Sequence, residues 1–361
     1  MKVVIAAGGT AGHVNPALAL AEAMSDHEVS FIGTRAGFEG DLVTAAGLSF
    51  HSIEARGFDR SRPLGLVPVG LVAVRAVRAA RKLLRRICPR VVVGMGGYVS
   101  LPVALAARSL GIPVVVHEQN IVLGLANKVA RRWARAVAVS FEETLETAGP
   151  RGVFVGDPVA RAVVDADVAR ERERGLARFD LDPGRRTLIV FGGSLGALRV
   201  NEAAAGLAVE WRDRSDRQIV HILGRRQNAA AATGDDGGPL VYRRVQFVER
   251  MVEAYAVADL ALCRGGATTV AELAVMGLPA IIVPYPHHRD RQQERHGRVL
   301  ERAGAAIVLP DADTTAARVA DEAGALLDDG ETLVRMSKAA RSLARPRAAH
   351  DLAEVVLGVA G

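Results

Sequence analysis

Hydrophobic positions along the chain alternate between short apolar runs of strand length and longer stretches rich in Ala and Leu that fit a helix. The apolar run at 3–7 precedes a glycine turn, and the stretch from about Pro16 to Met24 predicts a helix. The same order returns at 187–191, with a second glycine turn and a helix that begins within 201–208. Two such openings, about 184 residues apart, predict two Rossmann-like halves.

Other short apolar runs supply the remaining strands that such halves need. They lie at 28–33, 91–94, 114–117, 137–140 and 153–155 in the first half, and at 219–223, 240–245, 260–263, 280–283 and 307–309 in the second. With helices in the gaps, they predict an α/β fold with two parallel sheets. We place a first domain at 1–158, where Pro158 favours an extended connection, a second at 159–340, and at 341–361 a helix that can pack back on the first.

Composition agrees with two globular domains and excludes several other classes of protein, among them disordered and disulfide-rich chains. The 361 residues suffice for two cores, and 50% hydrophobic with 24% charged residues excludes a disordered chain. Only Cys88 and Cys263 are present, far apart, and no His cluster has metal spacing, so a disulfide framework or a structural zinc site has no sequence support. We expect no metal and no cofactor. The uncharged runs at 3–21 and 91–107 are broken by glycine and proline, so we expect neither a signal peptide nor a membrane span.

The net charge of +6 is concentrated in the first half of the chain. Residues 1–158 hold 18 basic and 12 acidic residues, whereas the remainder holds 28 of each. The segment 64–86 joins an apolar stretch to a basic helix, which predicts docking on an anionic membrane surface. The alternative is a core-packed helix with a solvated basic face. We expect no nucleic-acid partner, because the few aromatic residues offer no stacking platform.

The first glycine turn, GGTAGH at 8–13, suits a phosphate group, because a glycine turn before a helix presents backbone N–H groups and a positive helix end. A tight turn without a ligand is the alternative. The dinucleotide fingerprint is absent, so hydride transfer is disfavoured. His13 opens the first helix, where the dipole favours neutral imidazole, which can accept a proton; a merely capping histidine is the alternative.

The second half repeats this chemistry near positions 265 and 290. Gly265 and Gly266 precede a helix in which Glu272 falls one to two turns inside, so a diphosphate can rest on the helix start while the carboxylate reaches sugar hydroxyls. The alternative for Glu272 is a solvated helix face. Gln292 and Gln293 follow a proline-rich turn, and their amides suit polyol recognition unless they only begin an exposed helix.

Five motifs together resemble the MurG family of bacterial glycosyltransferases. They are GGTAGH at 8–13, GMGGYVS at 94–100, HEQN at 117–120, GGSLGA at 192–197 and DRQQ at 290–293. The resemblance runs from about residue 1 to 310. It implies a GT-B architecture and an inverting, metal-independent transfer of N-acetylglucosamine from UDP-N-acetylglucosamine to lipid I, which is undecaprenyl-diphospho-muramoyl-pentapeptide. The product is lipid II for peptidoglycan synthesis, and the enzyme acts as a peripheral protein on the cytoplasmic face of the membrane.

The resemblance also implies roles for individual residues. Ser194 contacts the diphosphate, Glu272 binds the ribose hydroxyls, and Val248 lies against uracil through its backbone. The remaining donor and sugar contacts implied are Ala267, Thr268, Thr269, Val270, Ala271, Gln292, Gln293, Asn120, Thr10, Ala11 and Gly12. His13 is the candidate general base, and Glu118 is a second candidate that can instead orient the acceptor.

Several positions depart from the family pattern. Arg161 stands one residue later than the family's arginine, which turns its side chain by about 100° on a helix and weakens its assignment as a substrate contact. Ala11 replaces a glycine, Gly265 stands where a serine is common, and the segment 287–289 is one residue longer than usual.

Other functions of the same fold stay open at this point. They are a different UDP-sugar transferase acting on a lipid or an aglycone, a UDP-N-acetylglucosamine epimerase, and a non-catalytic nucleotide-sugar-binding module. The motifs at 94–100 and 117–120 favour the transferase, because both lie in the acceptor half and an epimerase or an idle binding module would leave them free to vary.

Overall fold

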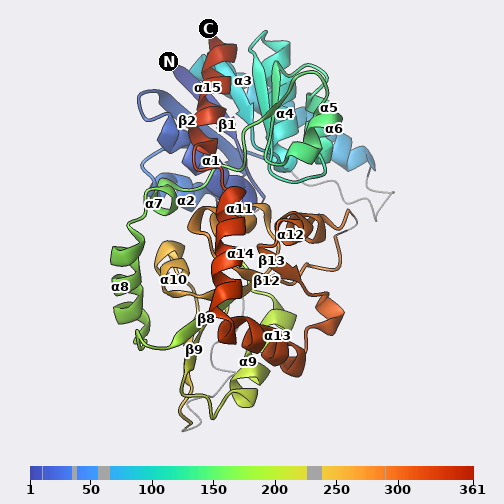
Figure 1. The fold of residues 1–361 in the computed structure, drawn as a ribbon. Coiled ribbons are helices and arrows are strands. Elements are labelled where there is room, and N and C mark those ends of the chain that lie inside the picture. The colour runs from blue at the N-terminus through green and yellow to red at the C-terminus, as the bar shows by residue number, and fades with distance from the viewer. Residues whose placement is uncertain (10, 35–38, 56–65, 226–237, 289) are drawn as a thin grey trace. The chain divides into compact units, whose positions relative to one another are not determined.

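The computed structural model describes residues 1–9, 11–34, 39–55, 66–225, 238–288 and 290–361, with only the backbone described at 11 and 66–71. The chain forms two compact units (Figure 1): unit 1 comprises Met1–Ala160 with Arg345–Gly361, and unit 2 comprises Arg161–Ala344. The last helix, α15 (Ala348–Ala360), lies beside α1 in unit 1 and buries Leu352 and Val356 in its core.

Unit 1 is built on a seven-stranded parallel sheet in the order β3-β2-β1-β4-β5-β6-β7. Its strands are β1 (Lys2–Ala6), β2 (Glu28–Thr34), β3 (Ser49–Ile53), β4 (Val91–Gly94), β5 (Val114–Glu118), β6 (Ala136–Val139) and β7 (Gly152–Phe154). The five strands predicted after the first are present within one or two residues. The edge strand β3 was not predicted, because Ser49, His51 and Ser52 break its apolar pattern.

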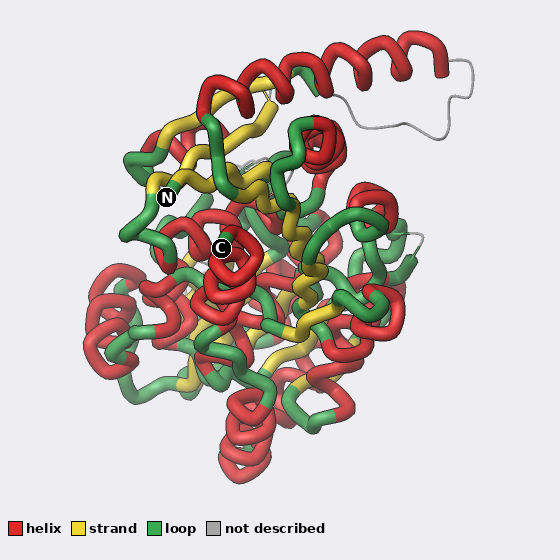
Figure 2. The backbone as a smooth tube through the Cα atoms, turned by 90° about the horizontal axis from the view of Figure 1, so that it is seen from above, coloured by secondary structure: helices red, strands yellow, loops and turns green. Residues whose placement is uncertain are grey.

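Helices cover both faces of this sheet. They are α1 (Ala11–Ala23), α2 (Glu39–Ala45), α3 (Leu66–Ile87), α4 (Gly97–Ser109), α5 (Leu125–Ala130) and α6 (Leu145–Ala148). α1 and α15 close one core, and α3 and α4 close the other. Figure 2 shows α3 as the long helix beside the grey trace. The predicted helix start at Pro16 was wrong, because the helix already begins at Ala11 and accommodates the proline inside.

Unit 2 repeats the plan with a six-stranded parallel sheet in the order β10-β9-β8-β11-β12-β13. The strands are β8 (Arg186–Phe191), β9 (Arg217–Ile222), β10 (Val241–Val245), β11 (Leu260–Cys263), β12 (Ala280–Ile282) and β13 (Ala306–Val308). The helices are α7 (Arg161–Val164), α8 (Val168–Phe179), α9 (Leu198–Glu210), α10 (Met251–Val257), α11 (Ala267–Met276), α12 (Gln292–Arg302), α13 (Ala316–Asp328) and α14 (Gly330–Ser342). The α/β prediction is therefore confirmed.

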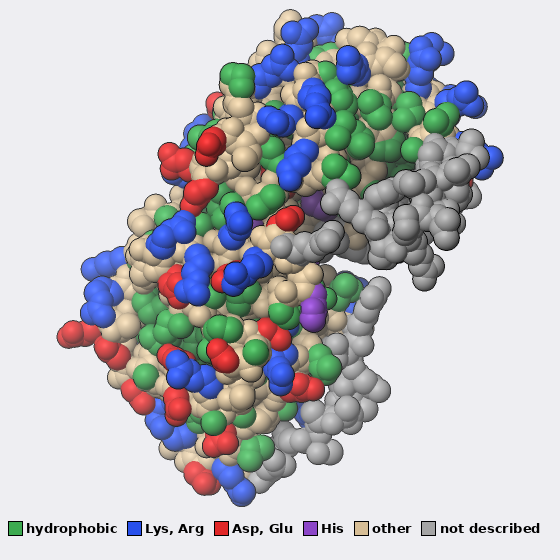
Figure 3. Space-filling model, turned by 90° about the vertical axis from the view of Figure 1, so that its right-hand side faces the viewer, with side chains coloured by type: hydrophobic (Ala, Val, Ile, Leu, Met, Phe, Trp, Pro, Cys, Tyr) green, Lys and Arg blue, Asp and Glu red, His purple; other side chains and the backbone are tan. Residues whose placement is uncertain are grey.

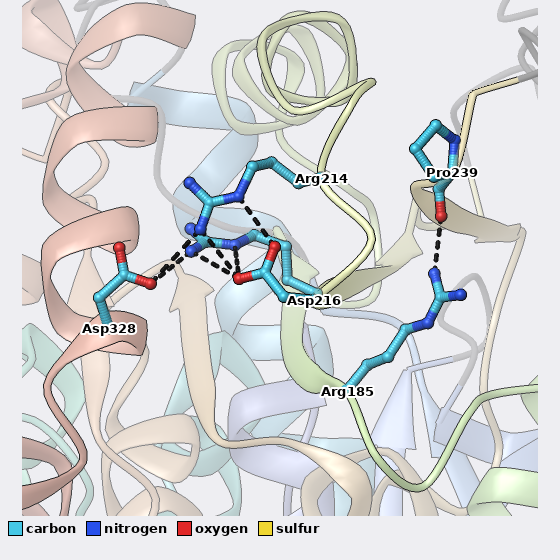
Figure 4. A network of polar contacts seen from close by, with 6 residues as sticks. Arg185, Arg214, Asp216, Pro239 and Asp328 are labelled. Carbon is cyan, nitrogen blue, oxygen red and sulfur yellow. Dashed lines mark hydrogen bonds and ion pairs between the residues drawn. The ribbon is translucent and has the colours of Figure 1, made fainter.

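An ionic network fastens α13 to the amino end of this second sheet (Figure 4). Arg217 is the largest fully buried side chain of the described residues, and it donates to Asp328 at 2.5 Å and to Asp216 at 3.1 Å. Arg214 pairs with the same two carboxylates at 3.5 and 2.8 Å, as Figure 4 shows. Its guanidinium also lies 4.7 Å from the centre of the Trp211 ring. Buried cations need such partners, because an unpaired charge inside a protein is costly. The network lies at the opposite end of the strands from the loops described next.

Candidate active site

Both sheets carry a topological switch point, where the strand order reverses beside the first strand of the unit. In unit 1 it lies between β1 and β4, and in unit 2 between β8 and β11. Open parallel sheets bind ligands at the carboxyl ends of the strands at such points, since neighbouring loops turn away to opposite faces. The motifs at 8–13, 94–100 and 192–197 all follow these strands directly.

In unit 1, the glycines after β4 form a flat backbone surface for His13. Gly96 and Gly97 have φ of +87° and +75°, the region that glycine adopts readily. A Cβ on Gly96 would lie 2.9 Å from Cε1 of His13, and one on Gly97 would lie 2.2 Å from the carbonyl oxygen of Gly8. The motif thus needs glycine because no side chain fits between these loops. His13 itself is half-buried in the first turn of α1.

Gln119, a residue without a predicted role, joins His13 to the interior of unit 1. Its Oε1 lies 3.1 Å from Nδ1 of His13, and its Nε2 donates to the carbonyl oxygen of Met95 at 2.9 Å and lies 3.2 Å from Nδ1 of His117. Burial lowers the pKa of His117 to about 4, so this second imidazole is neutral at pH 7. His13 is therefore the one member of the pair that reaches the surface of the switch point.

Glu118 lies on the last position of β5 with both carboxylate oxygens occupied. Oε1 accepts from the backbone N–H and side-chain amide of Asn120 at 3.0 and 3.1 Å. Oε2 accepts from the backbone N–H of Gly124 at 2.7 Å and from Nδ2 of Asn127 at 3.0 Å. These four hydrogen bonds occupy the acceptor positions of both oxygens, so the carboxylate is already committed to the loop that follows β5. The geometry suits positioning Asn120 better than acting as a base.

In unit 2, the glycine loop after β8 is equally tight. A Cβ on Gly192 would lie 2.4 Å from the backbone nitrogen of Ala197, and one on Gly224 would lie 2.2 Å from the nitrogen of Gly196. Ser194 is half-buried in this loop, and its carbonyl oxygen accepts from the N–H of Arg225 at 3.0 Å. The loop leads into α9 and holds the serine at the carboxyl edge of the sheet.

The start of α11 is the second element at this edge. Gly266 precedes it in extended conformation, and no acidic residue occupies its first turn to compete for the helix N–H groups. Oγ1 of Thr268 is buried and has no hydrogen-bond partner among the described residues. Buried hydroxyls are normally paired, so this oxygen needs a partner that the described chain does not provide.

Glu272 does not lie on a solvated helix face, which excludes that alternative. Its side chain is half-buried, and Oε2 accepts from the hydroxyl of Tyr255 at 2.7 Å. Tyr255 in turn packs edge-on against Phe191, the last residue of β8. Burial raises the pKa of Glu272 to about 7, and the Tyr255 hydrogen bond offsets part of that rise.

Gln292 and Gln293 begin α12 beside the loop that joins β11 to α11. Gln293 Oε1 accepts from the N–H of Tyr285 at 2.9 Å, whereas Gln292 Oε1 is buried without a hydrogen-bond partner among the described residues. A Cβ on Gly265 would lie 2.5 Å from the carbonyl oxygen of Gln293, so the glycine found there permits close contact between the two loops. Arg264, another residue without a predicted role, donates to the carbonyl oxygens of Val283 and Pro284 at 3.1 and 3.0 Å, and so braces the proline-rich turn.

Some predicted site residues carry less information. Thr10 lies outside the described residues, the side chain of Ala11 is not described, and Gly12 is exposed. Arg289, which belongs to the longer segment at 287–289 and was not a predicted site residue, also lies outside the described residues. The side chain of Val248 is buried in the loop after β10. Arg161 is 72% exposed and pairs with Asp165 one turn later at 2.8 Å, so its geometry gives no support to a substrate contact. Among the described residues, no three His, Cys, Asp or Glu side chains gather as a metal site would require.

Comparisons with known proteins place the chain in a family. Residues 3–139 match the glycosyltransferase family 28 N-terminal domain, and residues 187–352 match the C-terminal domain of that family. A protein of a Nocardioides species is 41% identical over 99% of this chain and 98% of its own length, and one of Corynebacterium efficiens is 41% identical over 100% and 98%. Both are named UDP-N-acetylglucosamine--N-acetylmuramyl-(pentapeptide) pyrophosphoryl-undecaprenol N-acetylglucosamine transferase.

Solved structures agree with this assignment. MurG of Acinetobacter baumannii superposes with a TM-score of 0.75 at 30% identity, covering 99% of each chain. A UDP-GlcNAc 2-epimerase from Neisseria meningitidis reaches a TM-score of 0.68 at only 12% identity, which shows a common fold and nothing about activity. With full-length relatives at 41% identity, the chain belongs to the MurG transferases of glycosyltransferase family 28, which have the GT-B fold.

Proposed function

We propose that this protein transfers N-acetylglucosamine from UDP-N-acetylglucosamine to lipid I, with release of UDP and formation of lipid II. The observation that carries the proposal is the identity over the whole length to transferases named for this donor and acceptor. The loops at the two switch points supply the groups that the reaction needs. No specific observation favours an epimerase or an idle binding module.

The donor belongs to unit 2 in this proposal. The diphosphate rests on the loop with Ser194 and on the N-terminus of α11, where backbone N–H groups and the helix dipole stabilise negative charge. Glu272 accepts hydrogen bonds from the ribose hydroxyls, and the loop with Val248 faces the base. The buried unpaired oxygens of Thr268 and Gln292 support a ligand here, since polar groups of a nucleotide sugar can provide the missing partners.

The chemical step needs a base in the acceptor half. The acceptor hydroxyl oxygen attacks the anomeric carbon from the face opposite UDP and transfers its proton to His13. The bond from the anomeric carbon to the β-phosphate oxygen breaks, and the electron pair leaves with UDP. The positive end of α11 stabilises the charge that develops on the leaving diphosphate, so the configuration inverts without a covalent intermediate on the protein.

We further propose that unit 1 binds the cytoplasmic surface of the membrane through α3. No helix of the described residues is long and apolar enough to cross a membrane. Ala76, Ala80 and Leu84 face the core, and the basic face of α3 is exposed. This basic face consists of Arg75, Arg78, Lys82, Arg85 and Arg86. Figure 3 shows Lys and Arg side chains spread over unit 1 with hydrophobic side chains between them.

The transferase activity is tested with purified protein, UDP-N-acetylglucosamine and a short-chain lipid I analogue. We expect a lipid-linked disaccharide by mass spectrometry, formed in equal amount to the UDP released. The variant His13→Ala should bind UDP normally but lose roughly 100- to 10,000-fold in kcat, as removal of a general base predicts. UDP release in the absence of acceptor, with no disaccharide in its presence, would refute the proposal.

A further inference from the structure

A chain of hydrogen bonds leads from His13 into the interior of unit 1. It passes through Gln119, which is 1% exposed, to His117, which is fully buried, and ends at the carbonyl oxygen of Gly156. The general-base proposal uses only the outermost member of this chain. The inner members decide which of the two imidazole nitrogens of His13 carries a proton.

The carbonyl oxygen of Met95 fixes the orientation of the Gln119 amide. A backbone carbonyl can only accept, so the group 2.9 Å from it must be the NH₂ of Gln119. The amide oxygen then faces Nδ1 of His13 at 3.1 Å, and this oxygen also can only accept. Nδ1 of His13 must therefore carry a hydrogen, and Nε2 of the neutral ring must carry the lone pair.

The carbonyl oxygen of Gly156, at the other end of the chain of hydrogen bonds, requires the same orientation of the Gln119 amide. Nε2 of His117 lies 3.2 Å from the carbonyl oxygen of Gly156, so it carries the hydrogen of that neutral ring. Nδ1 of His117 is then an acceptor, and the second N–H of Gln119 lies 3.2 Å from it. A flipped Gln119 amide would place its oxygen against two acceptors at once. Both anchors thus require the same orientation.

The ring of His13 is also prevented from turning over. Its Cε1 and Nδ1 lie against Gly96, 2.9 and 3.0 Å from where a Cβ would be, so the imidazole fills the space above the glycine backbone. Rotation by 180° would bring carbon instead of Nδ1 to the Gln119 oxygen and forfeit that hydrogen bond. The packing on Gly96 fixes the plane of the ring, and the hydrogen bond to Gln119 selects which edge of the ring faces the amide.

We infer that Gln119 is a positioning residue that holds His13 in the Nδ1–H tautomer and so leaves Nε2 as the proton acceptor. The inference rests on the proposed function only in that His13 acts there as the base. Gln119 occupies the place of the carboxylate in a catalytic triad, where the partner fixes the histidine tautomer. A neutral amide does so without adding a negative charge beside the ring.

The tautomer is tested directly by nitrogen NMR of the wild-type protein labelled with ¹⁵N-histidine, with His13→Ala identifying the His13 signals. At a pH where His13 is neutral, we expect a protonated Nδ1 and an unprotonated Nε2. The signals of His221 and His296, buried in unit 2, serve as internal references. A protonated Nε2 would overturn the inference. This measurement needs no enzymatic activity, so its outcome is independent of whether lipid I is the acceptor.

Two variants of similar size separate tautomer control from simple packing. Gln119→Met removes the acceptor, and we expect kcat to fall roughly 10- to 100-fold with the KM for UDP-N-acetylglucosamine unchanged, and the His13 tautomer signals to shift. Gln119→Glu keeps an acceptor oxygen beside Nδ1, but its second oxygen faces the carbonyl oxygen of Met95 and must carry a proton to donate there. With that proton in place, we expect this variant to retain the Nδ1–H tautomer and a kcat within about tenfold of wild type. Thermal unfolding confirms that both are folded. A folded Gln119→Met with wild-type kcat overturns the inference.

Discussion

Glu272 combines two properties that oppose each other. Its side chain is half-buried against Tyr255, which disfavours the charge, and yet the role proposed for it, accepting hydrogen bonds from two ribose hydroxyls, requires the ionised carboxylate. With a pKa raised to about 7, the free protein holds this group close to half ionised at neutral pH. Ligand binding and protonation of Glu272 should therefore compete.

This competition predicts a pH-dependent affinity for UDP. Because only the ionised form accepts both hydroxyls, the dissociation constant should be about tenfold higher at pH 6 than at pH 8. Isothermal titration calorimetry in buffers of different ionisation enthalpy should also show proton release on binding near pH 7. Glu272→Gln should bind UDP more weakly and without this pH dependence. A dependence that persists in the Gln variant would locate the titrating group elsewhere.

Glu272 should also make the free energy of unfolding depend on pH, and the sign of that dependence follows from its raised pKa. The pKa of Glu272 is higher in the folded protein than its ordinary value of 4.5, so the folded state binds more protons between pH 4.5 and 7. The stabilisation of the folded state by protonated Glu272 is therefore fully present below about pH 4.5 and is lost as pH rises through 7. Urea unfolding should show Glu272→Gln to be more stable than wild type at pH 8, by about 3 kcal/mol. Equal stabilities at pH 8 would contradict the assignment.

At the scale of elements, the turn from β4 into α4 depends on contact between two loops. Gly97 and Gly47 both have positive φ, +75° and +72°, but a Cβ on Gly97 meets the carbonyl oxygen of Gly8 whereas one on Gly47 meets nothing within 4 Å. Alanine at each position therefore meets the same backbone strain, and only alanine at 97 also meets the carbonyl oxygen of Gly8. Gly47→Ala should lose about 1 kcal/mol of unfolding free energy from backbone strain alone, and Gly97→Ala about 3 kcal/mol or more.

Unfolding by denaturant measures this difference, and transferase assays add a functional readout. Gly97→Ala should also lower activity, because moving this loop moves the surface on which His13 rests. Gly47→Ala should leave kcat unchanged. If both alanine variants lose the same stability, the close contact with Gly8 does not contribute.

The elements and the site residues differ in how far the sequence predicts them. Buried parallel strands such as Val91–Gly94 are continuous apolar runs, so their positions follow from the sequence, whereas the edge strand Ser49–Ile53 is half polar and was missed. His13 and Glu272 could be proposed because each stands beside a glycine turn. Gln119 could not be given a role, since its partners His13 and Met95 lie 106 and 24 positions away and only the fold brings them together.

At the scale of the molecule, many of the excess basic residues of the first half lie on one helix, α3. The segment from Arg60 to His117 contains ten basic residues and no acidic one, and its described part includes α3. The buried stripe of α3 packs on α4, so the exposed arginines are free to meet a surface without unfolding the core. In our proposal the acceptor is anchored in the bilayer by its undecaprenyl chain. The surface that the exposed arginines meet is therefore an anionic membrane.

Charge reversal on α3 tests this arrangement against a matched control. Arg78→Glu with Lys82→Glu changes two exposed residues of α3, and Arg335→Glu with Lys338→Glu changes two exposed residues of α14 in unit 2, with the same change in net charge. Since each basic residue near anionic lipid contributes about 1 kcal/mol, the α3 pair should weaken binding to anionic vesicles at least tenfold, and the α14 pair should have little effect. Vesicle flotation measures both, with neutral vesicles as reference. Both variants should keep wild-type turnover of a soluble short-chain acceptor, because neither pair belongs to the loops at the switch points. Equal weakening by the two pairs would show that net charge, and not the face of α3, determines membrane binding.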